Sequence, residues 1–284
     1  MKLRSDAVAQ FLGIRRYWPL AAHKWRNQSV TRNLSYTPHL VTYVDILGFR
    51  ELVHKQHPNF ISRIIRRVIE TTKPDEVDKK ENEENYVNFS DLIVHTVPIN
   101  SRSNVTYPSG VVYSEILGLV HAQAELIDEG LLLRGAVTIG DIERSYRVIF
   151  GPGLISAYDL EQKSARFPRI IVDASLLRAT KKNRLLRFHD EPKDEMKYIS
   201  ALVQKDDDGV AFIDYLGGMQ DEFREPDDYV SFLDIHRKLI SKGLSDFAGN
   251  RKILRKYRWL RKYHNRVIRK RLKPKLHRQY CVKV

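Results

Sequence analysis

Short runs of apolar residues alternate with longer amphipathic stretches through the middle of this 284-residue chain. Short runs bounded by turn residues are typical of buried strands, and apolar residues spaced three and four apart are typical of helices. The pattern predicts the order strand, helix, strand, strand, helix, strand, which is the split βαβ arrangement of a ferredoxin-like sheet. The expected strands are residues 40–46, a tight hairpin at 86–98 and 131–141, and the expected helices are residues 49–71, with a break near Pro58, and 111–130.

The pattern continues with a strand at 147–150, a glycine-opened helix at 151–165 and a strand at 169–173. Asp206 to Gly209 predict a hairpin turn before a further strand, whereas the charged residues 71–85 lack apolar periodicity and predict an exposed loop. The expected fold class is α+β, a ferredoxin-like βαββαβ sheet with extra C-terminal strands and helices. The expected organisation is a basic N-terminal arm at 1–39, a folded domain at 40–215 and a helical basic extension at 216–284.

Composition adds that the basic charge is unevenly placed. The chain carries a net charge of +14, yet residues 251–284 contain 15 Lys and Arg and no acids. The preceding 250 residues are therefore close to neutral, and the basicity belongs to an appendage. Residues 272–284 show little apolar periodicity and predict a mobile end whose deletion leaves the chemistry intact.

The two ends of the chain bear on localisation. Residues 1–44 hold seven basic residues against one acid, Asp6, which favours a basic arm over a transit peptide. Cys281 has no cysteine partner, so we expect a reducing, cytoplasmic compartment and no zinc site. No apolar run reaches the roughly 18 residues of a membrane-spanning helix.

The stretch YVDILGFREL, residues 43–52, places the carboxylate of Asp45 at the end of a strand. Asp45 could cap the following helix or hold a metal ion. In the expected topology the third strand runs antiparallel to the first, so Asp91 at its start would meet Asp45. Two unpaired carboxylates held close repel each other, and a divalent cation is their natural partner.

Five motifs, in this order, carry a family resemblance: DILGF, FSD, LLRGAVTIG, FGPGLISAYDLE and PRIIVD. Over about residues 40–175 the chain resembles the catalytic domain of class III nucleotide cyclases. The combination looks most like the bacterial Pycsar anti-phage cyclases, which make cyclic UMP or cyclic CMP as an alarm signal. The resemblance implies conversion of UTP or CTP to the 3′,5′-cyclic nucleotide plus pyrophosphate, and a separate effector that senses the product.

The resemblance also implies site residues. Two Mg²⁺ or Mn²⁺ ions would be held by Asp45, Asp91 and the carbonyl oxygen of Ile46, and both aspartates would be catalytic. The turn containing Phe49 and Arg50 would offer contacts to the nucleotide phosphates. Family members work as head-to-tail dimers, so a homodimer is implied.

The chain departs from the family where an Asn and an Arg usually orient the ribose and stabilise the transition state. Ile155 and Asp159 stand at those positions. Either Arg166, Arg169 or a cation of a second subunit substitutes, or the protein is a degenerate cyclase that binds nucleotide without turnover.

The two positions that read a purine base in the family also differ here. They hold Val87 and Pro152, whose side chains offer no hydrogen bond. A purine would leave buried polar atoms unpaired, so we expect a pyrimidine, UTP ahead of CTP.

Further residues leave alternatives open. Arg134 forms either a buried ion pair or a triphosphate contact, Arg169 is favoured as a phosphate-binding cation, and His95 is expected to pack in the core. Tyr257, Trp259 and Tyr263 lie among basic residues and could stack on nucleic acid. Packing on the core or on a dimer partner is favoured, because one helical face contains Ile253, Tyr257, Leu260, His264 and Val267. The competing hypothesis is a nucleic-acid-binding protein on a ferredoxin-like scaffold, with the basic tail on phosphate backbones; it leaves both aspartates unexplained.

Overall fold

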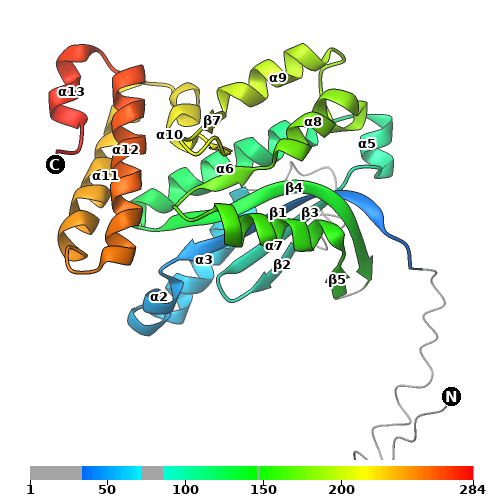
Figure 1. Ribbon diagram of the computed structural model, residues 1–284, viewed down its shortest axis with the longest axis horizontal. Coiled ribbons are helices and arrows are strands. Elements are labelled where there is room, and N and C mark those ends of the chain that lie inside the picture. Colours follow the sequence, from blue (N-terminus) through cyan, green and yellow to red (C-terminus); the bar gives the residue numbers. More distant parts are fainter. Residues whose placement is uncertain (1–33, 72–85, 146–147, 284) are drawn as a thin grey trace, which may run out of the picture. The chain divides into compact units, whose positions relative to one another are not determined.

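The computed structural model describes residues 34–71, 86–145 and 148–283. The expected basic arm lies outside the described residues up to residue 33, and so does the expected loop from residue 72 onward. Residues 36–284 form one compact unit, shown in Figure 1.

A mixed sheet forms the centre of this unit, with strand order β2-β3-β1-β4-β6-β8-β7 and β5 paired with β4. β1 is antiparallel to β3 and β4, and β4 is parallel to β6. The first four strands have the order of a ferredoxin-like sheet, which confirms the α+β prediction. The strands are β1 (Thr37–Leu47), β2 (Tyr86–Phe89), β3 (Leu92–Pro98), β4 (Leu132–Ser145), β5 (Val148–Phe150), β6 (Ile170–Val172), β7 (Val203–Lys205) and β8 (Ala211–Ile213).

The helices follow the predicted pattern through the first part of the chain. The expected break near Pro58 separates two helices, and Pro58 opens the second, where its missing N–H costs nothing. Short helices in the 101–107 and 174–221 regions were not predicted. The helices are α2 (Phe49–Lys55), α3 (Pro58–Thr71), α5 (Arg102–Thr106), α6 (Val111–Asp128), α7 (Pro152–Ser164), α8 (Ala174–Lys182), α9 (Pro192–Ala201), α10 (Tyr215–Gly218), α11 (Pro226–Asp246), α12 (Arg251–Arg271) and α13 (Pro274–Tyr280), with 3₁₀ turns at Arg184–Leu186 and Met219–Asp221.

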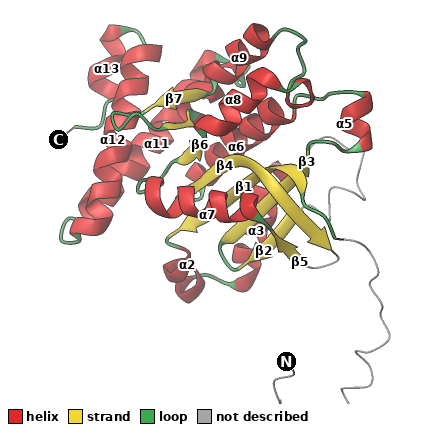
Figure 2. Cartoon of the chain, turned by 45° about the vertical axis from the view of Figure 1, so that its right-hand side comes forward, coloured by secondary structure: helices red, strands yellow, loops and turns green. Residues whose placement is uncertain are grey.

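The two faces of the sheet are covered by different helices (Figures 1 and 2). Side chains alternate along a strand, so Leu40 and Val44 of β1 join the large core that contains α3 and α6. Val41 faces the other way and packs with Ala157 of α7. Asp45 shares the parity of Val41 and therefore lies on the α7 face.

A glycine contact brings α7 close to the sheet. A Cβ atom on Gly140 of β4 would lie only 2.5 Å from the Cα atom of Gly153. Any larger residue would push the helix outward, so this pair sets the depth at which α7 lies on β4.

The C-terminal helices share the main core with the sheet. Leu260, His264 and Val267 of α12 are buried, which confirms the predicted packing face, and Trp259 and Tyr263 are buried with them. These rings are therefore not available as an exposed stacking platform for bases. His95 is also buried as expected, with Nδ1 at 2.9 Å from Glu115.

The prediction of a mobile end at 272–284 is wrong. This segment contains α13, and Val282 is buried. The side chain of Asn265 bonds both the N–H and the carbonyl of Val282, at 2.8 and 3.0 Å. A search for apolar periodicity does not detect hydrogen bonds between the Asn265 side chain and the backbone of Val282.

Candidate active site

Asp45 and Asp91 meet at one edge of the sheet, as the topology predicted. Asp45 is in register with Leu92, the first residue of β3, and Asp91 lies in the turn before it. The N–H of Ile46 donates to the carbonyl of Asp91 at 3.3 Å, which ties the end of β1 to that turn. The residue that caps α2 is Gly48, without a side-chain cap. The helix-cap alternative for Asp45 is therefore wrong.

Arg134 lies directly opposite Asp45 on β4. Its Nη2 atom is 2.8 Å from the Asp45 carboxylate and 2.6 Å from the carboxylate of Glu161. Arg134 was expected to form either an ion pair or a triphosphate contact, and the structure contains the ion pair.

Glu161 is a site residue that the sequence reasoning missed. Its side chain is only 1% exposed, on the inner face of α7. Gly153, Ala157 and Glu161 recur every four residues, and all three are buried. Two small residues at this spacing indicate a helix face that packs on a sheet, and a carboxylate on the same face is the signal that could have identified Glu161.

Burial, and next the neighbouring Asp91, raise the pKa of Asp45 to about 6, although Arg134 acts in the opposite direction. Negative charge at this edge is therefore only partly neutralised by the chain itself. One Asp45 oxygen accepts from Arg134, and the Asp91 carboxylate lies close enough to raise the pKa of Asp45, so a cation shared by the two carboxylates would relieve their repulsion. The donors fit Mg²⁺ or Mn²⁺, which take carboxylates and substrate phosphates together.

The chain supplies few metal ligands at this edge. Within the residues that the structure describes, no three His, Cys, Asp or Glu side chains gather in an arrangement that could hold a metal ion. A divalent cation here would depend on Asp45, Asp91, the Ile46 carbonyl and the substrate itself.

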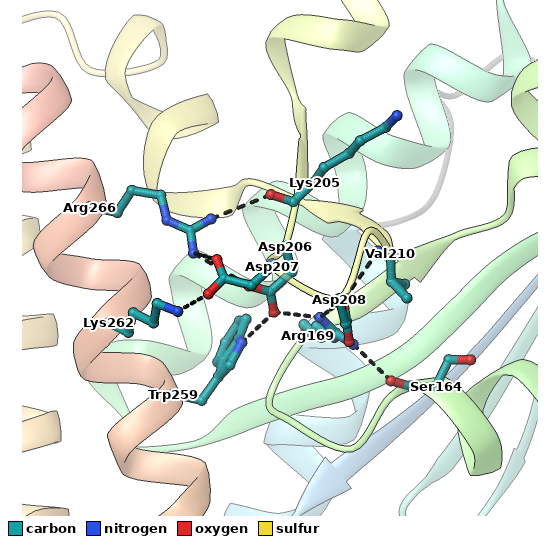
Figure 3. Close-up of polar contacts among 10 residues, drawn as sticks. All are labelled: Ser164, Arg169, Lys205, Asp206, Asp207, Asp208, Val210, Trp259, Lys262 and Arg266. Carbon is teal, nitrogen blue, oxygen red and sulfur yellow. Dashed lines mark hydrogen bonds and ion pairs between the residues drawn. The ribbon is translucent and has the colours of Figure 1, made fainter.

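The other residues predicted to contact the nucleotide, Phe49, Arg50 and Arg169, differ in their exposure. Phe49 is buried in the core, so only its backbone could reach a ligand, whereas Arg50 is exposed on the first turn of α2. The guanidinium of Arg169 is 1% exposed and is bonded to Asp206 at 2.5 Å and to Asp208 at 2.6 Å (Figure 3). The predicted turn at 206–209 thus forms, and it also neutralises this arginine.

The positions that depart from the family pattern lie on exposed surfaces. Ile155 is 65% exposed on α7, and Asp159, one turn later, pairs with Lys163 at 2.7 Å. Arg166 is exposed after α7, with its Nε atom bonded to the Lys163 carbonyl. In the described chain no hydrogen bond or ion pair joins any of these three side chains to Asp45 or Asp91.

Comparison with known proteins gives limited information. No known family model and no curated protein matches the sequence. Two solved structures are similar in backbone arrangement. The adenylyl cyclase CyaB from P. aeruginosa has a TM-score of 0.40 and 11% identity, covering 63% of this chain and 95% of its own. The guanylyl cyclase domain of the RhoGC fusion protein from the aquatic fungus Blastocladiella emersonii has a TM-score of 0.41 and 11% identity, covering 63% and 96%. At 11% identity these similarities concern the backbone arrangement alone.

Proposed function

We propose that this protein is a nucleotide cyclase that converts UTP or CTP to the 3′,5′-cyclic nucleotide and pyrophosphate. The observation that carries the proposal is the meeting of Asp45 and Asp91 at the end of β1, with the pKa of Asp45 raised to about 6. A pair of half-buried carboxylates that Arg134 only partly neutralises favours a further cation, and a cation held by two carboxylates suits a triphosphate substrate.

The reaction joins the ribose 3′-oxygen to the α-phosphorus and breaks the bond from that phosphorus to the bridging oxygen of the β-phosphate. The 3′-proton passes to water, and pyrophosphate leaves. Bound Mg²⁺ or Mn²⁺ supplies charge neutralisation for the leaving group and favours the 3′-alkoxide. Asp45, Asp91 and the carbonyl of Ile46 would hold it.

The remaining residues bind and orient. Arg134 fixes the Asp45 carboxylate from β4 and holds it in place through Glu161. The backbone of Phe49 and the side chain of Arg50, four and five residues after Asp45, are proposed to contact phosphate. Arg134 is proposed to share its charge with the triphosphate. Arg169 was expected to bind phosphate. Its ion pairs with Asp206 and Asp208 favour a role in positioning the β7–β8 turn instead.

The choice of a pyrimidine rests on Val87 and Pro152. Val87 lies in β2 and Pro152 opens α7, and neither side chain can donate or accept a hydrogen bond. A product that acts as an alarm signal in anti-phage defence, through a separate sensing effector, is proposed from the family resemblance alone.

A homodimer is part of the proposal. Phe150, Ile155 and Tyr158 expose apolar surface on β5 and α7, and Ile155 stands at one of the positions where the family carries its transition-state residues. A second copy covering this face would bring a cation to the positions that Ile155 and Asp159 occupy.

The test is incubation of the purified full chain with each of the four nucleoside triphosphates and Mn²⁺, with product identification by mass spectrometry. Cyclic UMP or cyclic CMP as the main product supports the proposal. Cyclic AMP or cyclic GMP would keep the cyclase and overturn the base assignment. Tight nucleotide binding without turnover would identify a degenerate cyclase, with Arg134 in the place of a metal ion.

A further inference from the structure

A cluster around Asp206 holds α12 against the sheet (Figure 3). The carboxylate of Asp206 accepts from Arg169 and from the indole Nε1 of Trp259, each at 2.5 Å. Arg266, two turns further along α12, approaches the same carboxylate at 3.4 Å. The β7–β8 turn therefore fixes the position of α12 along its length.

The same cluster connects α12 to the candidate active site. The carbonyl of Arg169 accepts from the N–H of Gly135 at 3.2 Å, and Gly135 follows Arg134 on β4. Phe167 stacks on Trp259 with ring centroids 5.6 Å apart. Arg255 of α12 lies 5.9 Å from the Phe167 ring. The first half of α12 consequently passes the sheet edge at which Arg134 meets Asp45.

Lys256 lies three residues before Trp259, less than one helical turn away. Its ammonium is half-buried, and burial is the main cause of its lowered pKa. The charges of Arg134 and Asp45 both act on this ammonium, as do those of Lys252 and Arg255 on its own helix. Over the described residues no hydrogen bond or ion pair of Lys256 is found, so its ammonium is available to an anion.

We propose that Lys256 binds the triphosphate of the nucleotide substrate and so brings α12 into the active site. The inference rests on the proposed function and extends it, because α12 lies outside the segment that resembles a cyclase. A lysine is suited to this task as a compact point charge on a flexible stem.

The placement separates two tasks within one site. Asp45 and Asp91 present negative charge to a metal ion, whereas Lys256 presents positive charge from the neighbouring helix. A triphosphate bridging them would neutralise both. Lys256 would also supply a positive charge that is missing at Asp159, the position where the family usually carries an arginine.

The test compares Lys256→Met with Lys270→Met. Lys270 is an exposed lysine on the same helix, about 21 Å further along it at 1.5 Å per residue. Lys256→Arg and Lys256→Gln are made as well; the first restores the charge, and the second keeps the proposal testable if the methionine variant fails to fold. Calorimetry measures binding of inorganic tripolyphosphate in the presence of Mn²⁺, and steady-state kinetics give kcat and KM for the best nucleotide.

We expect tripolyphosphate binding and kcat/KM to weaken at least tenfold in Lys256→Met and Lys256→Gln, with KM carrying most of the change. Lys256→Arg should recover part of the loss, and Lys270→Met should match the unmodified chain. Equal binding and equal KM in Lys256→Met would overturn the inference and leave the cyclase proposal standing. Tripolyphosphate binding that depends on Lys256, without turnover of any nucleotide, would support the inference and overturn the cyclase. Failure of the unmodified chain to bind tripolyphosphate would overturn the inference.

Discussion

Arg134 and Asp45 form an ion pair across neighbouring strands, with 2.8 Å between the guanidinium and the carboxylate. The same guanidinium lies 2.6 Å from Glu161 of α7. One arginine thus links the end of β1 to the helix that covers it. Since Arg134 keeps a carboxylate partner when Asp45 is removed, the fold should survive changes at Asp45.

Asp45→Ala and Asp91→Ala should each reduce nucleotide turnover by at least about 100-fold, because losing one carboxylate removes several kcal/mol of metal-dependent transition-state stabilisation. The fold should persist, as judged by circular dichroism and thermal unfolding. Asp159→Ala serves as the control, since Asp159 is paired only with Lys163 in the described structure. Undiminished product from either aspartate variant at ordinary metal concentration contradicts the site.

Arg169→Met should lower the free energy of unfolding by about 3–5 kcal/mol, because it leaves a buried carboxylate without its main partner. The Asp206 side chain is only 6% exposed. Arg184→Met, which breaks an exposed pair with Asp190, should cost less than about 1 kcal/mol. Urea unfolding measures both. A small loss of stability together with a large rise in KM would return Arg169 to the phosphate-binding role.

The contribution of His264 and His236 to stability should be lost as the pH drops from 6.5 toward 4, whereas protonation of Asp45, whose folded pKa is raised, acts in the opposite direction. Burial lowers the pKa of His264 to about 4 in the folded chain, and it lowers that of His236 as well. Their Nδ1 atoms lie 3.0 Å apart. These histidines bind protons first in the unfolded chain, so their contribution to stability is fully present above pH 6.5 and is lost as the pH decreases.

The expected loss from His264 alone is about 3 kcal/mol. Urea unfolding at a series of pH values measures it, and His264→Gln should flatten the profile. His54→Gln, at an exposed position, should not change it. An unchanged slope in His264→Gln would assign the acid sensitivity elsewhere.

A chain that ends at Leu272 should be less stable by about 3 kcal/mol, because it loses the burial of Val282 and the hydrogen bonds to Asn265. The carbonyl of Tyr280, which bonds His264 at 2.9 Å, is lost too. A chain that ends at Val282 should be unaffected. Turnover per folded molecule should be retained, and its complete loss in a soluble dimeric truncation would show that α13 takes part in the chemistry.

Ile155→Arg should weaken a homodimer and lower turnover at a given protein concentration by about tenfold or more, since a charge would replace an apolar side chain at the covered face. Sedimentation velocity measures the assembly. Ile235→Arg, at an exposed site on α11, is the control. A monomer with full turnover at all concentrations would exclude the dimer.

The strands and the first site residues were predictable because both depend on local pattern. Apolar runs fixed the order of β1 to β6, and the order places Asp45 beside Asp91 without any knowledge of side chains. Glu161 was missed because a charged residue carries no apolar signal, and only its spacing from Ala157 shows that it faces the sheet.

Contacts over long sequence separations could not be predicted in the same way. Arg169 was expected at a phosphate, yet its partners Asp206 and Asp208 lie 37 and 39 residues away. Lys256 is one cation among many on a basic helix, and only the docking of α12 distinguishes it. Residues 272–284 were expected to be mobile because hydrogen bonds from Asn265 to the Val282 backbone leave no apolar pattern in the sequence.

The carboxylate of Asp206 joins residues that leave the ribosome at different times. Trp259 follows Arg169 by 90 positions in the chain, and a ribosome adds about 5–20 residues per second, so roughly 5–20 seconds separate the two. Throughout that interval Phe167 lacks the ring on which it later stacks. A nascent chain that stops near residue 250 contains Asp45, Asp91 and Arg134 but lacks α12. In that chain the ring of Phe167 and the β7–β8 turn lack their α12 partners, so they are available for a chaperone to bind.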